Sequence, residues 1–289
     1  MHVSGPVPAR ITDELQRAFL LLNDHRGADG VLSLITTTID ESYLEEAGPQ
    51  LKVLANYGVG VNNIDLEAAK RRGVLVANTP DVLTSTTAEL AISLMLALLR
   101  RVAEGDRLLR RREPWQFSLE FMLGESLDGK VLGIIGGGRI GRETARLAEA
   151  FGAKPIYVGR GDSLTHLLRQ ADIVSLHCPF TDDTHHLINE ATLAQMQPTA
   201  ILVNTARGPI VDETALVKAL RAGAIAGAAL DVFEFEPAVT DELLSMDNVV
   251  LTPHLGSATR TTREAMGMLA VSAIRSVLID GQPPPNTVA

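Results

Sequence analysis

The sequence predicts an α/β fold built on doubly wound parallel sheets, and three observations lead to that prediction. Short runs rich in Val and Ile alternate with helical segments, which is the pattern of repeated βα units. Few of these runs alternate apolar with polar residues, so we expect strands that are buried on both faces. A glycine-rich turn joins one such run to a helix within residues 131–151. Together they favour parallel sheets covered by helices on both sides.

Composition limits the functions worth considering. A chain of 289 residues that is 46% hydrophobic can bury a substantial core, and we expect two domains. The net charge of -9 argues against a nucleic-acid-binding protein, so an anionic substrate must be captured by local positive charge. The single cysteine, Cys178, excludes an intramolecular disulfide and fits a reducing cytoplasm.

Targeting and membrane-spanning segments are not expected. The N-terminus has no basic region followed by a long apolar stretch, so we expect no secretory signal. The most apolar stretch, residues 90–99, is far short of the ~20 residues that a membrane-spanning helix needs. We therefore expect a soluble, cytoplasmic protein without a membrane partner.

The elements can be taken in chain order. After an apolar run at residues 19–22, eight runs are predicted as strands: residues 52–58, 73–79, 131–136, 155–159, 172–177, 200–206, 226–233 and 248–254. Thr86 and Glu89 are spaced as a capping box, which predicts a helix from about residue 87 to 101. That helix is apolar nearly all round and must be buried on every side. A subunit interface is favoured, and interdomain packing is the alternative.

Two junctions divide the chain. Thr79 and Pro80 close the first group of βα units, and residues 257–281 read as a long helix that crosses back to the first domain. The tail, residues 282–289, is then an extended strap. We expect a discontinuous domain of residues 1–80 plus about 260–289, and a second domain of residues 81–259.

The glycine-rich turn predicts a dinucleotide site. Gly136, Gly138 and Gly141 form G-x-G-x-x-G directly after an apolar strand, with Arg139 and Ile140 between them. The first glycine permits the tight turn, the second lets a pyrophosphate approach the backbone, and the third allows close packing of helix and strand. The helix N-terminus supplies N–H groups and the positive end of its dipole.

The end of the next strand bears on which dinucleotide is bound. An acidic residue there usually accepts hydrogen bonds from the adenosine ribose, but this chain has Gly159 and Arg160. Absence of the acid and presence of a cation favour NADP over NAD. The alternative is NAD, with Asp162 bending back to the ribose.

Two segments look short. Between Arg160 and the strand that starts near residue 172 there is room for one helix and not for a further βα unit, so the strand at residues 155–159 should lie at a sheet edge. Near residues 20–30 the chain passes almost directly from one strand candidate into the next unit. We expect either a reduced first domain or a shortened chain.

Six motifs in order resemble one family across nearly the entire chain. "NYGVGVNNID", "VLTSTTAEL", "GGGRIG", "NTARGPIVDE", "ALDVFEFEP" and "TPHLGSAT" are similar to the D-isomer-specific 2-hydroxyacid dehydrogenases, especially the glyoxylate and hydroxypyruvate reductase branch. The resemblance implies two Rossmann-like domains, one binding the nucleotide and the smaller, flavodoxin-like one binding substrate.

The same resemblance implies the site residues. Arg207 matches the arginine that holds the 2-oxoacid carboxylate, His254 the acid/base histidine, and Glu236 its carboxylate partner. Asp231 matches the residue beside the nicotinamide carboxamide. Val59 and Gly60 match the loop whose N–H groups take the substrate carboxylate. The cofactor groove is matched by Thr87, Cys178, Pro179, Thr184, Thr205, Ala206 and Gly256. We assign no metal, because metal-ligand spacing is absent from the sequence.

The expected reaction is hydride transfer from NADPH, or from NADH as the alternative, to a small 2-oxoacid. His254 donates the proton as charge develops on oxygen, and Arg207 matches a carboxylate bidentately. We expect a homodimer formed through the nucleotide-binding domain. Two other functions stay open: the same chemistry on a larger 2-oxoacid or 2-ketoaldonate, and a dinucleotide-sensing corepressor that binds protein partners.

Overall fold

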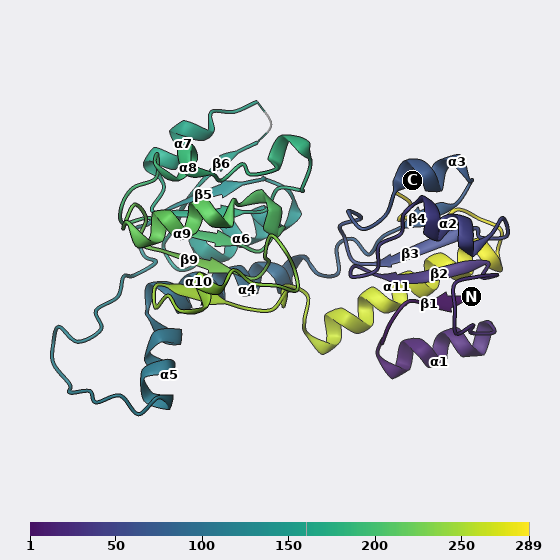
Figure 1. The fold of residues 1–289 in the computed structure, drawn as a ribbon, viewed down its shortest axis with the longest axis horizontal. Helices are drawn as coiled ribbons and strands as arrows, with labels where there is room; N and C mark the ends of the chain where they lie inside the picture. The colour runs from purple at the N-terminus through teal and green to yellow at the C-terminus, as the bar shows by residue number, and fades with distance from the viewer. Residues whose placement is uncertain (160, 289) are drawn as a thin grey trace. The chain divides into compact units, whose positions relative to one another are not determined.

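The chain divides into two compact units in the computed structural model, which describes residues 1–159 and 161–288 (Figure 1). Unit 1 comprises Met1–Leu83 and Ser257–Ala289, and unit 2 comprises Thr84–Gly256. The chain therefore passes between the units after Leu83 and again after Gly256, whereas the sequence pattern placed the junctions after residues 80 and 259.

Unit 2 is built on a six-stranded parallel sheet in the order β10-β9-β8-β7-β5-β6. Its strands are β5 (Val131–Ile135), β6 (Lys154–Val158), β7 (Ile173–Leu176), β8 (Ile201–Asn204), β9 (Gly227–Leu230) and β10 (Val249–Leu251). Its helices are α4 (Thr84–Leu99), α5 (Val102–Arg110), α6 (Arg139–Glu149), α7 (Leu164–Gln170), α8 (Glu190–Leu193), α9 (Glu213–Arg221) and α10 (Asp241–Leu244), with 3-10 turns η1 (Asp182–Thr184) and η2 (Gly208–Ile210). Every residue of β7, β8 and β9 is buried, as strands covered on both faces require.

Helices cover both faces of this sheet. Successive side chains of a strand point to opposite faces, so neighbouring residues join different cores. Ile173 belongs to the core that includes Met95 of α4 and Ala145 of α6. Val174 belongs to the core that includes Leu167 of α7 and Leu216 of α9. The doubly wound architecture that the sequence predicts is confirmed.

Unit 1 has a smaller parallel sheet in the order β1-β2-β3-β4. Its strands are β1 (His2–Val3), β2 (Gly30–Leu34), β3 (Val53–Tyr57) and β4 (Leu75–Ala77), and its helices are α1 (Ala9–Ala18), α2 (Glu41–Ala47), α3 (Leu66–Arg71) and α11 (Arg260–Leu278). Leu44 of α2 and Ala68 of α3 share a core with Leu54 of β3. The long helix α11 contacts β2, β3 and α1, so residues 260–278 do return to the first group of βα units.

Three details differ from the predictions. β1 and β2 precede the first strand that the pattern indicated firmly, and the apolar run at residues 19–22 contributes only an isolated bridge between His2 and Leu22. Helix α4 begins at Thr84, so Thr86 lies inside the helix and the expected capping box is wrong. The Ser85 hydroxyl donates instead to the Glu89 carboxylate one turn later, at 3.3 Å.

The shortened segment after β6 has the expected consequence. One helix, α7, connects β6 to β7, and β6 is the edge strand of its sheet. At the C-terminal end of the chain, Thr287 forms an isolated antiparallel bridge with Ala77, the last residue of β4, as an extended strap would. Among the described residues there is no helix with both the length and the apolar character that a membrane span demands.

Candidate active site

The carboxyl ends of neighbouring strands in unit 2 bring two predicted catalytic side chains together. His254 follows β10, and Glu236 follows β9. The Nδ1 atom of His254 lies 2.9 Å from Oε2 of Glu236. The two side chains are 30% and 35% exposed, so a reactant can reach the pair. Because the carboxylate engages Nδ1, Nε2 is the ring nitrogen that remains for proton exchange.

Glu236 is kept in its charged form by its surroundings. Burial raises the pKa of Glu236, but several contacts act in the opposite direction. The hydrogen bond and charge of His254, the Phe233 N–H group and the charge of Arg207 together hold the pKa of this carboxyl below its usual range. The pair therefore contains a carboxylate that stays charged and lies within hydrogen-bond distance of the imidazole ring.

Asp231 anchors the loop that carries His254. Its Oδ1 accepts hydrogen bonds from the Thr252 hydroxyl and the Leu255 N–H group, both at 2.6 Å, and its Oδ2 accepts from Gly256 N–H at 2.8 Å. Its backbone carbonyl accepts from His254 N–H at 2.8 Å. These bonds hold His254 at a φ of +54°, which residues other than glycine adopt only where their surroundings impose it. Sequence reasoning assigned Asp231 to the cofactor and missed this anchoring role.

Arg207 lies in a turn that directly follows β8. The Asn204 side chain donates to the Arg207 carbonyl at 2.9 Å and so fixes the turn. Gly208 is required next, because a Cβ there would lie 1.8 Å from the Phe233 carbonyl oxygen. The arginine turn and the segment that leads to Glu236 thus meet backbone to backbone. Burial lowers the pKa of Arg207 and the charge of Glu236 opposes that effect, yet a guanidinium stays cationic at neutral pH.

The glycine-rich turn has the shape that a pyrophosphate needs. Gly136 has a φ of +102°, and a Cβ there would lie 2.5 Å from the Cys178 nitrogen. A Cβ at Gly141 would lie 2.2 Å from the Gly136 carbonyl oxygen. At Gly138, in contrast, a Cβ would meet no atom of the described residues within 4 Å, and α6 begins immediately after it without a side-chain cap. The backbone at Gly138 is therefore open to the close approach of a group at the N-terminal end of α6.

An acidic side chain, that of Asp162, does lie close to the end of β6. The N–H group of Gly159 donates to Oδ2 of Asp162 at 2.9 Å. A carboxylate at this strand end can accept hydrogen bonds from a ribose with a free 2'-hydroxyl. Arg160 lies outside the described residues, so its predicted phosphate contact stays a prediction.

The other residues predicted for the cofactor groove lie in the segments that follow β7, β8 and β10 of unit 2 or in the first turns of α4 and α6. They are Thr87, Arg139, Ile140, Cys178, Pro179, Thr184, Thr205, Ala206 and Gly256. Side-chain hydroxyls tie the loops: Thr87 Oγ1 donates to the Gly256 carbonyl at 3.1 Å, and Thr184 Oγ1 to that of Pro179 at 2.8 Å. The Thr205 hydroxyl is buried and finds no partner among the described residues, which suits a contact with a ligand. Burial raises the pKa of the Cys178 thiol to about 11, so this thiol stays neutral.

His177 is a buried residue that sequence reasoning missed. His177 directly follows β7 and packs against the glycine-rich turn. A Cβ added at Gly141 would lie 3.3 Å from the Cβ of His177. Its Nε2 lies 2.9 Å from the Ser175 hydroxyl, and its Nδ1 has no partner within the part of the chain described. Burial lowers the pKa of His177 to about 4, so the ring is neutral. In the sequence, this residue could have been noticed as a polar side chain at the end of an apolar strand.

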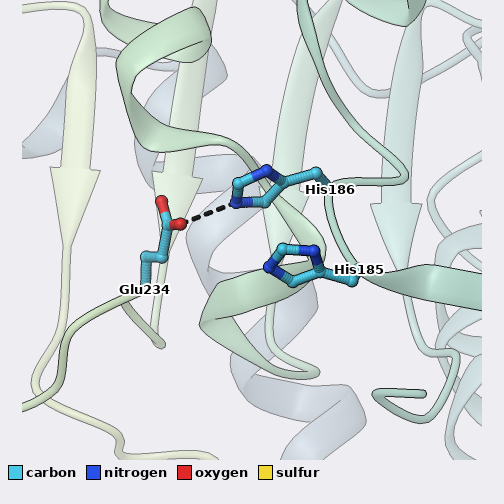
Figure 2. Close-up of side chains that lie close together, drawn as sticks. All are labelled: His185, His186 and Glu234. Carbon is cyan, nitrogen blue, oxygen red and sulfur yellow. Dashed lines mark hydrogen bonds and ion pairs between the residues drawn. The ribbon is translucent and has the colours of Figure 1, made fainter. Parts of the chain in front are cut away.

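Three further side chains gather at the same end of unit 2 (Figure 2). His186 Nε2 lies 2.6 Å from Glu234 Oε1, and the rings of His185 and His186 stack with centroids 4.0 Å apart. One ligating atom of each residue lies within 4.8 Å of the others. However, the in-plane lone pairs of the two stacked rings lie in nearly parallel planes, with an interplanar angle of 19° and centroids 4.0 Å apart, and so do not converge on one ion. We interpret the cluster as a link between the turn at residues 181–187 and the segment after β9.

The predicted substrate loop belongs to the other unit. Val59 and Gly60 follow β3 in unit 1 and are partly exposed. Their role toward the substrate carboxylate stays a prediction.

Known proteins resemble this chain over most of its length. The sequence profile of the D-isomer specific 2-hydroxyacid dehydrogenase, NAD binding domain, matches residues 92–256. A glyoxylate reductase of Thermococcus litoralis is 46% identical over 288 residues, which cover 93% of this chain and 86% of that protein. A glyoxylate reductase of Aeropyrum pernix is 48% identical over 286 residues, covering 93% and 85%.

Solved structures agree with these sequence matches. The TT0316 protein of Thermus thermophilus has a TM-score of 0.92 and 41% identity, with 100% of this chain and 99% of that chain covered. An NADPH-dependent glyoxylate/hydroxypyruvate reductase of Sinorhizobium meliloti, solved with NADP and malonate, has a TM-score of 0.88 and 35% identity, with 100% and 96% covered.

Proposed function

The chain belongs to the D-isomer-specific 2-hydroxyacid dehydrogenase family, and on that premise we propose that it reduces hydroxypyruvate to D-glycerate and glyoxylate to glycolate, which has no stereocentre. The match to the family's NAD binding domain covers most of unit 2, and the enzyme's cofactor is a nicotinamide dinucleotide. The relatives named glyoxylate reductase support a small 2-oxoacid as substrate.

The observation that carries the proposal is the His254–Glu236 pair at the strand ends of unit 2, with its 2.9 Å contact. When bound, the reduced nicotinamide supplies the hydride. His254 donates a proton from Nε2 as negative charge develops on the ketone oxygen, and Glu236 stabilises the imidazolium that precedes this step. Arg207 offers a planar, permanently charged fork for the substrate carboxylate.

The product identifies the reaction. Purified protein incubated with hydroxypyruvate and NADPH is expected to form D-glycerate, which chromatography on a chiral phase separates from the L-isomer. Formation of L-glycerate, or of no glycerate with either reduced cofactor, would contradict the proposal. Consumption of glyoxylate measured in parallel distinguishes a narrow substrate range from an inactive protein.

We propose NADP as the preferred cofactor, with NAD as the alternative. Gly159 removes the acid that would repel a 2'-phosphate, and Arg160 adds a cation beside it. The S. meliloti reductase named above, which was solved with NADP, supports this choice. The hydrogen bond from Gly159 to Asp162 favours NAD, because it holds a carboxylate at the same strand end.

We also propose a cytoplasmic homodimer formed through unit 2. No residue of α5 is buried, and Figure 1 shows α5 and the segment after it extending away from the sheet of unit 2. This arm, residues 102–124, exposes large apolar side chains: Val102, Leu109, Trp115, Phe117, Leu119, Phe121 and Leu123. A concentration of exposed apolar side chains on one segment is typical of a protein interface. The cytoplasmic location rests on the single cysteine.

A further inference from the structure

Residues 58–61, the substrate loop, have all four carbonyl groups engaged by hydrogen bonds within unit 1. In chain order, the donors are Thr79 N–H (3.0 Å), the Asn78 side chain (2.8 Å), the Asn56 side chain (2.7 Å) and Ile64 N–H (3.0 Å). Two of these four donors are therefore asparagine side chains that come from the ends of different strands, β3 and β4.

The N–H groups of the loop, unlike its carbonyls, are not used within unit 1. Those of Val59, Gly60 and Val61 donate to no acceptor in residues 1–159 and 161–288. In a trans peptide group the carbonyl and the following N–H point in opposite directions. When the carbonyls of Gly58, Val59 and Gly60 are turned into the unit, the next three N–H groups are turned out of it. Successive outward N–H groups form a concave site for an anion.

Asn56 is held in place by a buried polar network. Its Oδ1 accepts from the Ser33 hydroxyl at 3.0 Å and from the Asn63 side chain at 3.2 Å, while its Nδ2 donates to Gly60 and to Asn63 Oδ1. Asn56 and Ser33 are fully buried. All hydrogen-bonding capacity of the amide is used, so its orientation toward the loop is fixed.

Asn78 is held by the C-terminal segment. Its N–H donates to the Asn286 carbonyl at 3.2 Å, and the Asn286 side chain donates back to the Asn78 carbonyl. The next residues extend the contact along β4, where Val288 N–H donates to the Val76 carbonyl at 2.7 Å. The strap at the end of the chain thus reaches the substrate loop through one residue.

We propose that Asn56 and Asn78 are positioning residues that turn the N–H groups of the substrate loop outward to receive a carboxylate, and that Asn286 acts through Asn78. The proposal rests on the proposed function for the identity of the anion, a 2-oxoacid. None of the three asparagines touches the reacting atoms. Their effect is expected on substrate affinity and not on the hydride-transfer step.

Steady-state kinetics of Asn78→Ala and Asn286→Ala test the proposal. The matched control is Asn248→Ala, which loses an equivalent side-chain bond to the Ala226 carbonyl in unit 2. Loss of one such bond is expected to raise KM for glyoxylate about tenfold in Asn78→Ala and by a smaller factor in Asn286→Ala. The kcat at saturation and the Kd for NADPH should stay near wild type in both. An unchanged KM, or a parallel loss of kcat and NADPH binding, would overturn the proposal.

Amide hydrogen exchange separates this proposal from the proposed function. If the wild-type protein reduces no 2-oxoacid, the proposed function fails, but the loop can still be examined. Asn78→Ala should speed exchange of the Thr79 and Ile64 amides, which donate to the loop carbonyls, while Asn248→Ala should not. Equal exchange in wild type and Asn78→Ala would refute the positioning role whatever the substrate.

Discussion

Glu236 and His254 act on each other across a single hydrogen bond, and the charge of Glu236 is expected to set the pH range of reduction. Glu236→Gln removes the negative charge that faces the ring, and an opposite charge at hydrogen-bond distance favours the charged form of its partner. The upper pH limit of kcat for reduction should therefore move to lower pH. The pH profile of kcat checks this. The control is Glu234→Gln, which alters the His186–Glu234 pair in the same unit. An unchanged pH profile in Glu236→Gln would show that Glu236 does not act on His254 during reduction.

The burial of His177 predicts that unit 2 loses folding stability in acid. Its pKa is about 4 in the folded protein and 6.5 in the reference state, so the folded form binds the proton less readily. The resulting stability is present above pH 6.5 and is lost as pH falls toward 4. From these values wild type should lose about 2 kcal/mol between pH 7.5 and pH 5 through this residue. Urea unfolding at the two pH values measures it, and His177→Gln should show a smaller loss. Equal losses in both proteins would contradict the assignment.

The sequence reveals some site residues far better than others. Arg207, Glu236 and His254 stand in recognisable motifs, so their positions could be predicted without a structure. Asp231 as a loop anchor could not, because its partners follow a different strand. The same holds for the buried network of Asn56, whose members come together only when β2 and β3 pair. Side-chain partners distant along the chain leave no local pattern.

At the scale of elements, the edge strand β6 decides between two dinucleotides. Arg160 and Asp162 follow it and favour opposite cofactors. Arg160→Ala should weaken NADPH binding about tenfold and NADH binding much less, because only NADPH has a 2'-phosphate. Asp162→Ala should weaken NADH more than NADPH. Fluorescence titration of the wild type and both variants with both cofactors measures the six affinities, and equal losses for both cofactors in Arg160→Ala would refute the phosphate contact.

Strands were easier to predict than helix ends. All eight predicted runs contain strands, since buried parallel strands form nearly continuous apolar runs bounded by polar residues. The start of α4 was misplaced, because Thr84, Ser85 and Thr86 all suit a helix start and only tertiary packing selects one. Strand β1 was missed because two residues are too few for any periodicity.

At the scale of the molecule, the arm at residues 102–124 predicts self-association. Phe117 and Leu119 are 77% and 86% exposed, and a partner subunit that covers them would gain the free energy of their burial. The double variant Phe117→Asp, Leu119→Asp should shift the protein from dimer to monomer in light scattering after gel filtration. Leu20→Asp, at a residue 80% exposed in unit 1, is the control. A monomeric wild type, or a double variant that stays dimeric, would contradict the proposal.

Two domains were expected from the length and the apolar content of the chain, but the origin of catalysis cannot be read from domain organisation alone. The most direct test is the initial rate of NADPH and NADH oxidation with glyoxylate, measured for wild type and His254→Ala in matched wells. Wild type should be active, preferably with NADPH, and His254→Ala should lose about 100-fold or more in kcat while binding the cofactor normally. Equal rates for the two proteins would remove His254 from its proposed role, and an inactive wild type would contradict the reductase assignment itself.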